Sequence, residues 1–312
     1  MTDHIAAAVR AWSGLVGAWS SRDIGYTSDR VWEIVAASGT AFVLKRNDSS
    51  VRQLVAEARI LAHLSRNGVP VAVPIPSDDG RIAVRTDDGI FTLAPKLPAG
   101  SGDDHYDALE HFHIGVTMAR MHVALANCPY SIESPVVDLG LDTGVWRVLR
   151  ARLAPDVFAG WAERIRPWSG RIDAALDDPH RQRVHGDMHG GNILLGDDHT
   201  VSGIVDVDKL PVAPRIYDLG YNLMFSIEWA FQHDEPSGVI ERHLMVKARE
   251  LVRGYQTVSP LTEREIDALP AMALLTAVRL THWFLSTENS VRDTWLNTAI
   301  WITDHAEVLR PG

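Results

Sequence analysis

The decapeptide RVHGDMHGGN, residues 183–192, concentrates side chains that could take part in catalysis or bind a metal. In one interpretation, the alternating His185, Asp187 and His189 are the imidazole and carboxylate ligands of a zinc or iron ion. Alternation places side chains on one face only in a strand, and the three glycines of this segment disfavour a strand. Such a metallohydrolase would carry bound zinc or iron after purification.

In the other interpretation, the same loop transfers a phosphoryl group. Moving a γ-phosphoryl group to an alcohol requires a carboxylate that orients and deprotonates the hydroxyl, and Mg²⁺ held by oxygen ligands. Asp187 is the candidate base. Asn192 offers an amide oxygen to the metal, and Asp206 in GIVDVDKL supplies a carboxylate after the following hairpin.

A nucleotide must also reach this base, and the first third of the chain has side chains suited to binding it. Lys45 ends the strand-like segment FVLK, where its ammonium could pair with α and β phosphates. Glu57 on the next helix could hold that lysine in place. Taken singly, a strand-end lysine is usually solvated and a helix-edge glutamate usually lies on the surface. Their order along the chain, followed by Asp187, Asn192 and Asp206, is that of a kinase.

The elements that position these residues fall into two groups. Up to about residue 98 the pattern is β-rich, with turns at Ser38-Gly39 and Asp87-Asp88-Gly89. The expected elements are a helix over 2–18, two strands within 30–46, an amphipathic helix over 51–64, and strands over 81–86 and 90–97.

Beyond the small polar stretch 99–107 the apolar periodicity becomes mainly helical. We expect a small β-rich nucleotide-binding lobe, 1–98, and a larger helical lobe, 99–312, with the catalytic loop and substrate site. The expected helices cover 105–126, 155–177, 215–232, 237–257, 263–286 and 290–309, with a short hairpin at 193–195 and 201–207.

Composition restricts the partners. The chain has 312 residues, is 46% hydrophobic and contains one cysteine, Cys128, which favours a reducing cytoplasm and excludes a cysteine-based zinc cluster. A net charge of −10 argues against nucleic acid and suits a neutral or cationic small substrate, although mild acidity is also common for solubility alone. No uncharged apolar run is long enough to predict a membrane span.

The segments VHGDMHGGNILL and VSGIVDVDKLPVAPRIYDLGYN resemble the aminoglycoside phosphotransferase and choline kinase superfamily. The resemblance implies an α+β, protein-kinase-like fold with ATP bound between two lobes. It also implies roles for single residues: Asp187 as catalytic base, Asn192 and Asp206 as Mg²⁺ ligands, Lys45 as the phosphate-binding lysine, Glu57 as its partner, and Asp218 as a brace of the catalytic loop. His185 is expected to anchor the loop by hydrogen bonding.

The sequence departs from protein kinases at the phosphate-covering loop, where IGYTSDRVWEI keeps only Gly25. Ser28 is then the candidate phosphate contact, although serine also serves ordinary turn chemistry. The segment TLAPKLPAG matches the hinge, whose backbone near Ala94 and Leu97 would bond adenine. Pro95 has no N–H to donate.

The acceptor site is expected in the helical lobe. Glu228 and Trp283 fall on helices expected to line the cleft, and a carboxylate beside an indole suits an ammonium, although helix packing is the favoured explanation of both residues. Asp208 could assist with metal or substrate, or face solvent. The region LVRGYQTVSPLTEREIDALPAMALLTAVRLTHWFLS resembles type II homoserine kinases.

Together these features predict an ATP- and Mg²⁺-dependent phosphotransferase acting on a hydroxyl of an amino-alcohol, a homoserine-like amino acid, an amino sugar or an aminoglycoside. The alternative is a nucleotide-binding pseudokinase without transfer activity. A protein kinase fits less well, because little chain separates Asp206 from Asp218 to form a peptide platform. The sequence does not predict the oligomeric state.

Overall fold

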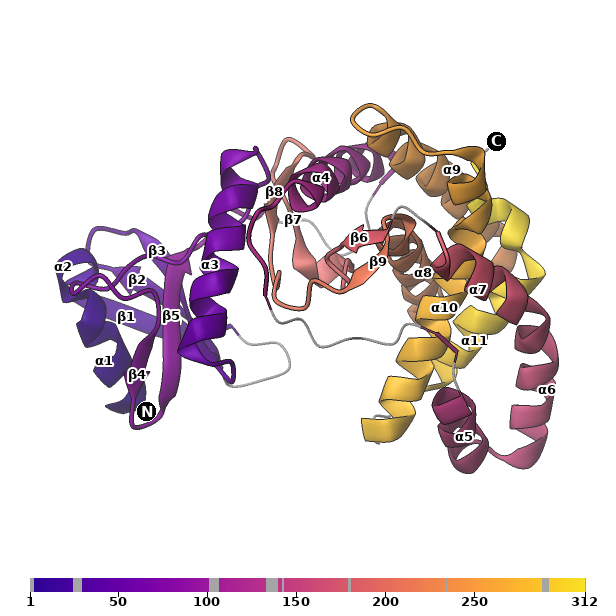
Figure 1. Cartoon of the computed structure of the whole chain (residues 1–312), viewed down its shortest axis with the longest axis horizontal. Helices are drawn as coiled ribbons and strands as arrows, with labels where there is room; N and C mark the ends of the chain where they lie inside the picture. The colour runs from indigo at the N-terminus through magenta and orange to yellow at the C-terminus, as the bar shows by residue number, and fades with distance from the viewer. Residues whose placement is uncertain are drawn as a thin grey trace.

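The computed structural model describes residues 3–24, 30–100, 107–132, 140–141, 143–178, 181–233, 235–287 and 292–311. Its N-terminal part is built on a sheet and its C-terminal part on helices, and each part carries one chain terminus (Figure 1). The predicted α+β architecture is therefore confirmed.

The N-terminal part contains a five-stranded antiparallel sheet in the order β1-β2-β3-β5-β4. Its core contains Trp12, Ile34, Leu44 and Phe91, because alternate residues of the strands point to the face that the N-terminal helices cover. The elements are α1 (Asp3–Val9), α2 (Ser13–Val16), β1 (Trp19–Asp23), β2 (Val31–Ala36), β3 (Ala41–Asn47), β4 (Val84–Thr86) and β5 (Gly89–Pro95).

Helix α3 (Val51–Arg66) packs against both parts. It begins at a capping box formed by Ser50 and Gln53. Leu54 packs with residues of the N-terminal part, whereas Ile60 and Leu64 belong to the core of the helical part. This helix therefore fixes Glu57, near its middle, at the junction of the two parts.

The helical part is centred on α8 and α10, whose side chains are buried on almost every face. By length and composition α10 alone among the described helices could cross a membrane, but most of it is buried inside the fold. The helices are α4 (Ala108–Ala126), α5 (Thr143–Arg152), α6 (Pro155–Ile165), α7 (Ser169–Leu176), α8 (Ile216–Gln232), α9 (Ser237–Gln256), α10 (Glu263–Thr287) and α11 (Arg292–Asp304).

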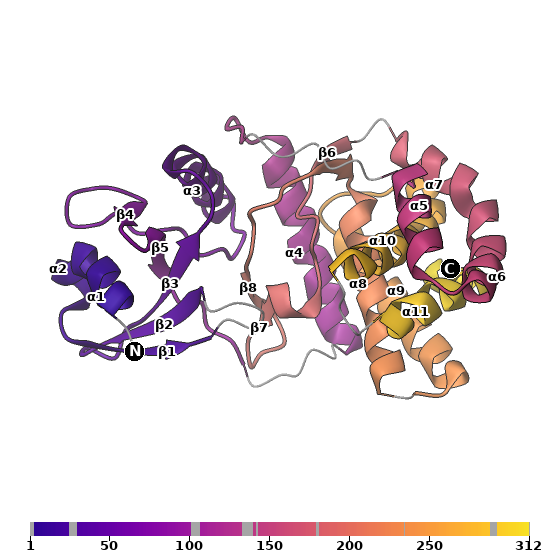
Figure 2. The ribbon, with the colours of Figure 1, turned by 90° about the horizontal axis from the view of Figure 1, so that it is seen from below.

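Two short antiparallel ribbons carry the chain through the predicted catalytic region. Strand β6 (Arg181–Arg183) pairs with β9 (Val212–Pro214), and β7 (Ile193–Leu195) pairs with β8 (Val201–Ile204). The β7–β8 ribbon lies between the N-terminal part and α4 (Figures 1 and 2). The ribbon contacts the segment that follows α3 through a hydrogen bond of 2.7 Å from Ile204 N to Pro70 O.

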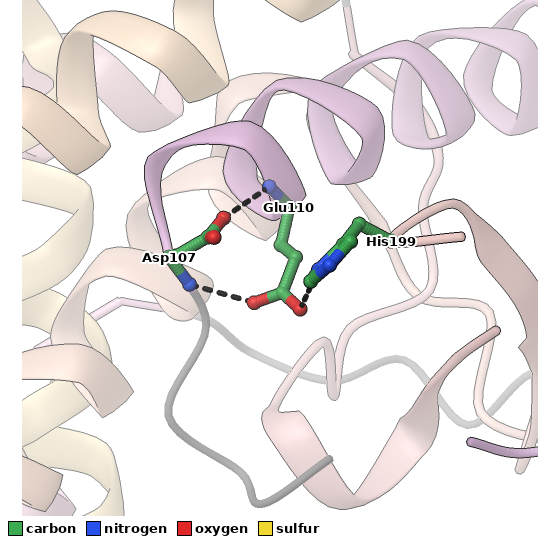
Figure 3. A group of neighbouring side chains, drawn as sticks. All are labelled: Asp107, Glu110 and His199. Carbon is green, nitrogen blue, oxygen red and sulfur yellow. Dashed lines mark hydrogen bonds and ion pairs between the residues drawn. The ribbon is translucent and has the colours of Figure 1, made fainter. Parts of the chain in front are cut away.

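The start of α4 is tied to the turn of that ribbon. Asp107 and Glu110 form a capping box, and Glu110 also accepts a 3.0 Å bond from His199 in the turn (Figure 3). The three side chains could in principle hold a cation, but their described bonds already serve to begin the helix and to anchor the turn.

Several elements differ from the sequence-based expectation. β1 was not predicted because WSSRD is polar and mostly exposed at the sheet edge, and α5, β6 and β9 were also missed. The helix expected over 155–177 is divided by a 3₁₀ turn at Arg166–Trp168, where Pro167 cannot donate a helical hydrogen bond. The helix expected over 290–309 ends at Asp304 and is followed by a 3₁₀ turn.

Helices α4 and α9 approach closely because glycines line their contact. A Cβ at Gly254 would lie 2.0 Å from Phe112 O, and one at Gly115 would lie 2.1 Å from Leu251 O. Both distances are far inside van der Waals contact with backbone atoms, which cannot rotate away. Glycine at these two positions therefore sets the separation of the helices.

We expect Gly254→Ala to lower the free energy of unfolding by roughly 2 kcal/mol or more, because the methyl group forces the helices apart. The matched control is Gly160→Ala in α6, where a Cβ meets nothing within 4 Å. The control should be neutral or slightly stabilising, since alanine is the better helix former. Urea unfolding of both variants tests this, and equal stability of the two would contradict the close-packing argument.

Candidate active site

The loop between β6 and β7 has an irregular backbone held by side chains. Gly186 has φ of 82°, and a Cβ there would lie 2.5 Å from Pro211 Cγ, so only glycine fits. His185 is fully buried; its Nε2 donates to Val205 O at 2.9 Å and its Nδ1 accepts from Asp187 N at 3.3 Å. Both ring nitrogens are engaged by backbone, so the zinc or iron interpretation of His185 is wrong.

Asp218, at the start of α8, braces this loop as predicted. Its Oδ1 accepts from Gly186 N and its Oδ2 from His185 N, each at 2.8 Å. Oδ2 also accepts from His122 Nε2 at 2.9 Å, and His122 Nδ1 lies 2.9 Å from the Tyr255 hydroxyl. Burial alone would raise the pKa of Asp218, but these donors outweigh it and the net pKa is lowered, so the carboxylate stays charged.

Asp187, the predicted base, is held by two side chains that were not among the predicted site residues. Lys209 Nζ lies 2.5 Å from Oδ2, and the Tyr221 hydroxyl lies 2.5 Å from Oδ1. His189 Nε2 is 3.9 Å from the same Oδ1. Burial acts to raise the pKa of Asp187, but the Lys209 charge and the two hydrogen bonds outweigh it, leaving the pKa below its ordinary value.

Asn192 and Asp206, the predicted metal ligands, present oxygen atoms at the same loop system. Asn192 Nδ2 donates to Asp187 O at 2.8 Å, which fixes the amide and leaves Oδ1 to accept. Asp206 has φ of 56°, a left-handed conformation that is costly for a residue other than glycine and is typical of functional sites. Its Oδ1 already contacts a cation, the Lys45 ammonium. An amide oxygen and a carboxylate are suitable ligands for Mg²⁺.

Lys45 joins the two parts of the molecule. Its Nζ lies 2.8 Å from Asp206 Oδ1 and 3.6 Å from Asp208 Oδ2. Burial would lower the pKa of Lys45, but the charges of Asp206 and Asp208 outweigh it and raise the pKa. Lys45 thus bonds Asp206 here, and the predicted pairing with Glu57 in the nucleotide complex stays a prediction.

Glu57 lies near these groups without a hydrogen bond to Lys45 among the described residues. Burial and then the charge of Asp208 raise the pKa of Glu57 to about 7, and Lys45 acts in the opposite direction. The carboxylate is therefore poised between its charged and neutral forms beside a cluster of charges.

The predicted nucleotide contacts outside this cluster lie at the C-terminal end of β5 and just beyond it. Ala94 pairs with Val43 in the β3–β5 ladder, and Leu97 follows β5 and lies against Gly203 of β8. The chain then crosses to the helical part, where Ser202 Oγ donates to Pro98 O at 2.6 Å. Ser28 lies outside the described residues.

The predicted acceptor residues are dispersed. Glu228 is only 4% exposed, and its described partner is the Gln232 amide. It lies two turns beyond Tyr221 on the face of α8 that also carries Phe225. Trp283 is 53% exposed and contacts Phe284 edge-on, so it is not a buried packing residue. Asp208 Oδ2 lies 3.6 Å from Lys45 Nζ, and the Asp208 side chain is 46% exposed to solvent.

An aromatic group borders the base instead. The Phe225 ring lies 5.2 Å from Tyr221, 5.0 Å from His189 and 5.1 Å from Trp295, centroid to centroid. The sequence could have indicated Lys209 and Tyr221. Lys209 follows Asp208 directly, and Tyr221 stands three residues after Asp218, on the same helix face. No sequence pattern could have indicated Trp295, because tertiary packing alone brings α11 next to Phe225.

The two-part fold, the braced loop and the side-chain oxygen atoms beside a lysine are the features expected of a phosphotransferase. The model of the phosphotransferase enzyme family matches residues 22–261, and the chain belongs to that family as a small-molecule kinase. The family resemblance expected from the sequence is thereby confirmed.

Individual relatives agree with this assignment. A homoserine kinase of Acidiphilium cryptum (strain JF-5) is 28% identical over 248 residues, covering 77% of this chain and 69% of the relative. An amicoumacin kinase in complex with AMP-PNP and Ca²⁺ shares the fold with a TM-score of 0.73 at 14% identity, over 99% and 96% of the two chains. A microcompartment-associated aminopropanol kinase has the same TM-score at 17% identity, over 96% and 95%.

The buried Glu228 should make stability depend on pH. Burial raises the pKa of Glu228 to about 7 from 4.5, with Gln232 and His233 acting in the opposite direction. The folded chain therefore binds this proton more tightly than the unfolded chain. The stabilisation that comes from binding this proton to Glu228 is complete at low pH. It is lost from the free energy of unfolding as the pH rises from 4.5 to about 7.

We expect Glu228→Gln to be more stable than the parent above pH 7, by on the order of 2 kcal/mol, and equal to it near pH 4.5. Thermal and urea unfolding between pH 4.5 and 8 measure this. The control, Glu163→Gln on the exposed face of α6, should follow the parent at every pH. A Glu228→Gln curve parallel to that of the parent would show that Glu228 does not titrate in this range.

Proposed function

We propose that this chain transfers the γ-phosphate of ATP to the hydroxyl of a small molecule that carries an amine. The observation that carries the proposal is the convergence of Asp187, Asn192 and Asp206 on one loop system that Lys45 contacts from the N-terminal part. These are the groups that phosphoryl transfer to an alcohol requires.

Asp187 suits the role of the base. Lys209 and Tyr221 keep the pKa of its carboxylate low, so it is ionised at neutral pH and can accept a hydrogen bond from the acceptor hydroxyl. The Tyr221 hydroxyl donates a hydrogen bond to Asp187 Oδ1 and thereby fixes the orientation of the carboxylate and of the remaining lone pair on that oxygen. As the oxygen of the alcohol forms its bond to phosphorus, its proton moves to Asp187 and the bond to the leaving ADP oxygen breaks.

Lys209 is positioned to interact first with Asp187 and then with the negative charge on the transferring phosphoryl group. Its ammonium is bonded to Asp187 Oδ2, and its side chain is 58% exposed. When the hydroxyl approaches Asp187, the flexible lysine can turn toward the transferring phosphoryl oxygens, whose negative charge attracts it. Lys209 then orients the base in the resting enzyme and stabilises negative charge during transfer.

Mg²⁺ would be held by Asn192 Oδ1 and the Asp206 carboxylate, and when bound it neutralises phosphate charge. Lys45 would exchange its present partner Asp206 for phosphate oxygens, with Glu57 as a second carboxylate near its ammonium. Ser28 and the backbone at Ala94 and Leu97 complete the proposed nucleotide contacts.

Two comparisons support an amine-bearing acceptor. Homoserine and aminopropanol, named for a sequence relative and a structural neighbour, are small molecules with both a hydroxyl and an amine. Phe225, the partly exposed ring of the aromatic group beside Asp187, offers a ring face that attracts an ammonium. Glu228, on the same face of α8, adds a carboxylate that an incoming cation would favour in its charged form.

The test is an ADP-release screen with homoserine, aminopropanol, choline, amino sugars and aminoglycosides as acceptors, run on the parent and on Asp187→Asn. One acceptor class should stimulate ADP release. Asp187→Asn should reduce that turnover by roughly 10²–10⁴-fold, because only activation of the hydroxyl is lost. Nucleotide affinity, measured by calorimetry, should change little.

The matched control is Asp173→Asn on the exposed face of α7, which removes the same charge and should keep full turnover. ADP release that no acceptor stimulates, with nucleotide bound normally, would favour the nucleotide-binding pseudokinase instead. Full activity of Asp187→Asn would overturn the role of the base.

A further inference from the structure

A pocket of about 380 Å³ lies on the helical part and includes none of the proposed catalytic or nucleotide-binding residues. Its wall includes Arg181 and Arg183 from β6, Arg215 at the start of α8, and Cys128 just beyond the end of α4. Three arginines among the residues that line one pocket are a local excess of positive charge in a chain whose net charge is −10.

Two of these arginines have no acidic partner. Arg215 is paired with Glu265 through Nε at 2.6 Å. Among the described residues, neither Arg181 nor Arg183 forms an ion pair with a carboxylate. Arg181 donates to Leu176 O at 3.0 Å and to Val212 O at 3.1 Å, and Arg183 donates to Tyr130 O at 3.0 Å. These neutral carbonyls orient the guanidinium groups and leave their charge uncompensated.

The rest of the wall does not compensate that charge either. The C-terminus of α4 exposes carbonyl oxygens, but Gln182 Nε2 donates to His122 O at 2.9 Å and Asn127 Nδ2 to Val123 O at 2.8 Å. These side chains occupy the carbonyls at the helix end. The pocket therefore presents donors and two unbalanced positive charges.

We propose that this pocket binds a small anion that carries a phosphate group. Guanidinium groups match the geometry of phosphate oxygens, and a phosphate or phosphomonoester brings about two negative charges at neutral pH, enough to balance both unpaired arginines. A pocket of about 380 Å³ admits a small phosphorylated molecule as well as free phosphate.

The bound anion would touch the strands that carry the catalytic machinery. Arg183 stands two residues before His185, and Arg215 stands three residues before Asp218. Strands β6 and β9 pair at Arg183 and Val212. A ligand that draws Arg183 and Arg215 together therefore acts on the loop after β6 and on the start of α8, the two segments that the Asp218 carboxylate joins. The pocket is thus a binding site behind the catalytic loop and not part of the proposed phosphoryl-transfer site.

Cys128, the only cysteine of the chain, reports on occupancy. We would measure the rate at which neutral N-ethylmaleimide modifies Cys128 while inorganic phosphate replaces chloride at constant ionic strength. A ligand that covers the thiol slows labelling by the factor 1 + [L]/Kd, about elevenfold at about 10 Kd. An anion beside the thiol also disfavours the reactive thiolate, which acts in the same direction.

We expect saturable protection of the parent and no protection of the double variant Arg181→Gln, Arg183→Gln. The matched control, Arg52→Gln with Arg59→Gln on the exposed face of α3, removes the same two charges and should be protected like the parent. O-phosphoserine is the second probe. Stronger protection by it than by phosphate identifies a phosphorylated metabolite as the ligand, and equal protection identifies free phosphate.

Labelling of the parent that shows no saturable response to either probe overturns the proposal, and that result does not depend on any variant. Protection that persists in the arginine double variant also overturns it, because the anion would then act from another site. Arg181→Lys with Arg183→Lys retains both charges, so protection of this variant separates loss of charge from loss of folding in the glutamine variant.

Discussion

The carboxylate of Asp218 is the interaction on which the active-site loop depends. It is fully buried, yet it stays charged because two successive backbone N–H groups and the His122 ring donate to it. A buried charge is tolerable only with such partners, and the loop backbone cannot leave without stranding the carboxylate. Gly186 permits the turn that aims both N–H groups at one side chain.

The proposed catalytic groups follow this brace along the chain. Asp187 follows the two braced residues directly, Asn192 closes the loop by donating to Asp187 O, and Tyr221 comes one turn after Asp218 on α8. Helix α8 thus holds the loop through Asp218 and orients the proposed base through Tyr221. The second ribbon then brings Asp206 to Lys45, so the loop of the helical part and the sheet of the N-terminal part meet through an ion pair.

Much of the fold was predictable because strong local patterns coincide with burial. The β2–β3 hairpin and α3, α8 and α9 were expected close to their observed positions, and their apolar residues form the cores. The polar edge strand β1 and the short pair β6–β9 were not, since their pairing depends on partners distant in sequence. The division of the chain at 98/99 into two lobes stays a prediction.

The sequence by itself determined which residue types stand at the catalytic loop, and hence the class of chemistry, because Asp187, Asn192 and their glycines lie within one short segment. Only the tertiary structure decided what surrounds them. Lys209 and Tyr221 reach Asp187 from 22 and 34 residues away, and Lys45 reaches Asp206 across 161. Such contacts follow from how helices and ribbons pack, and packing places side chains together that no local spacing connects.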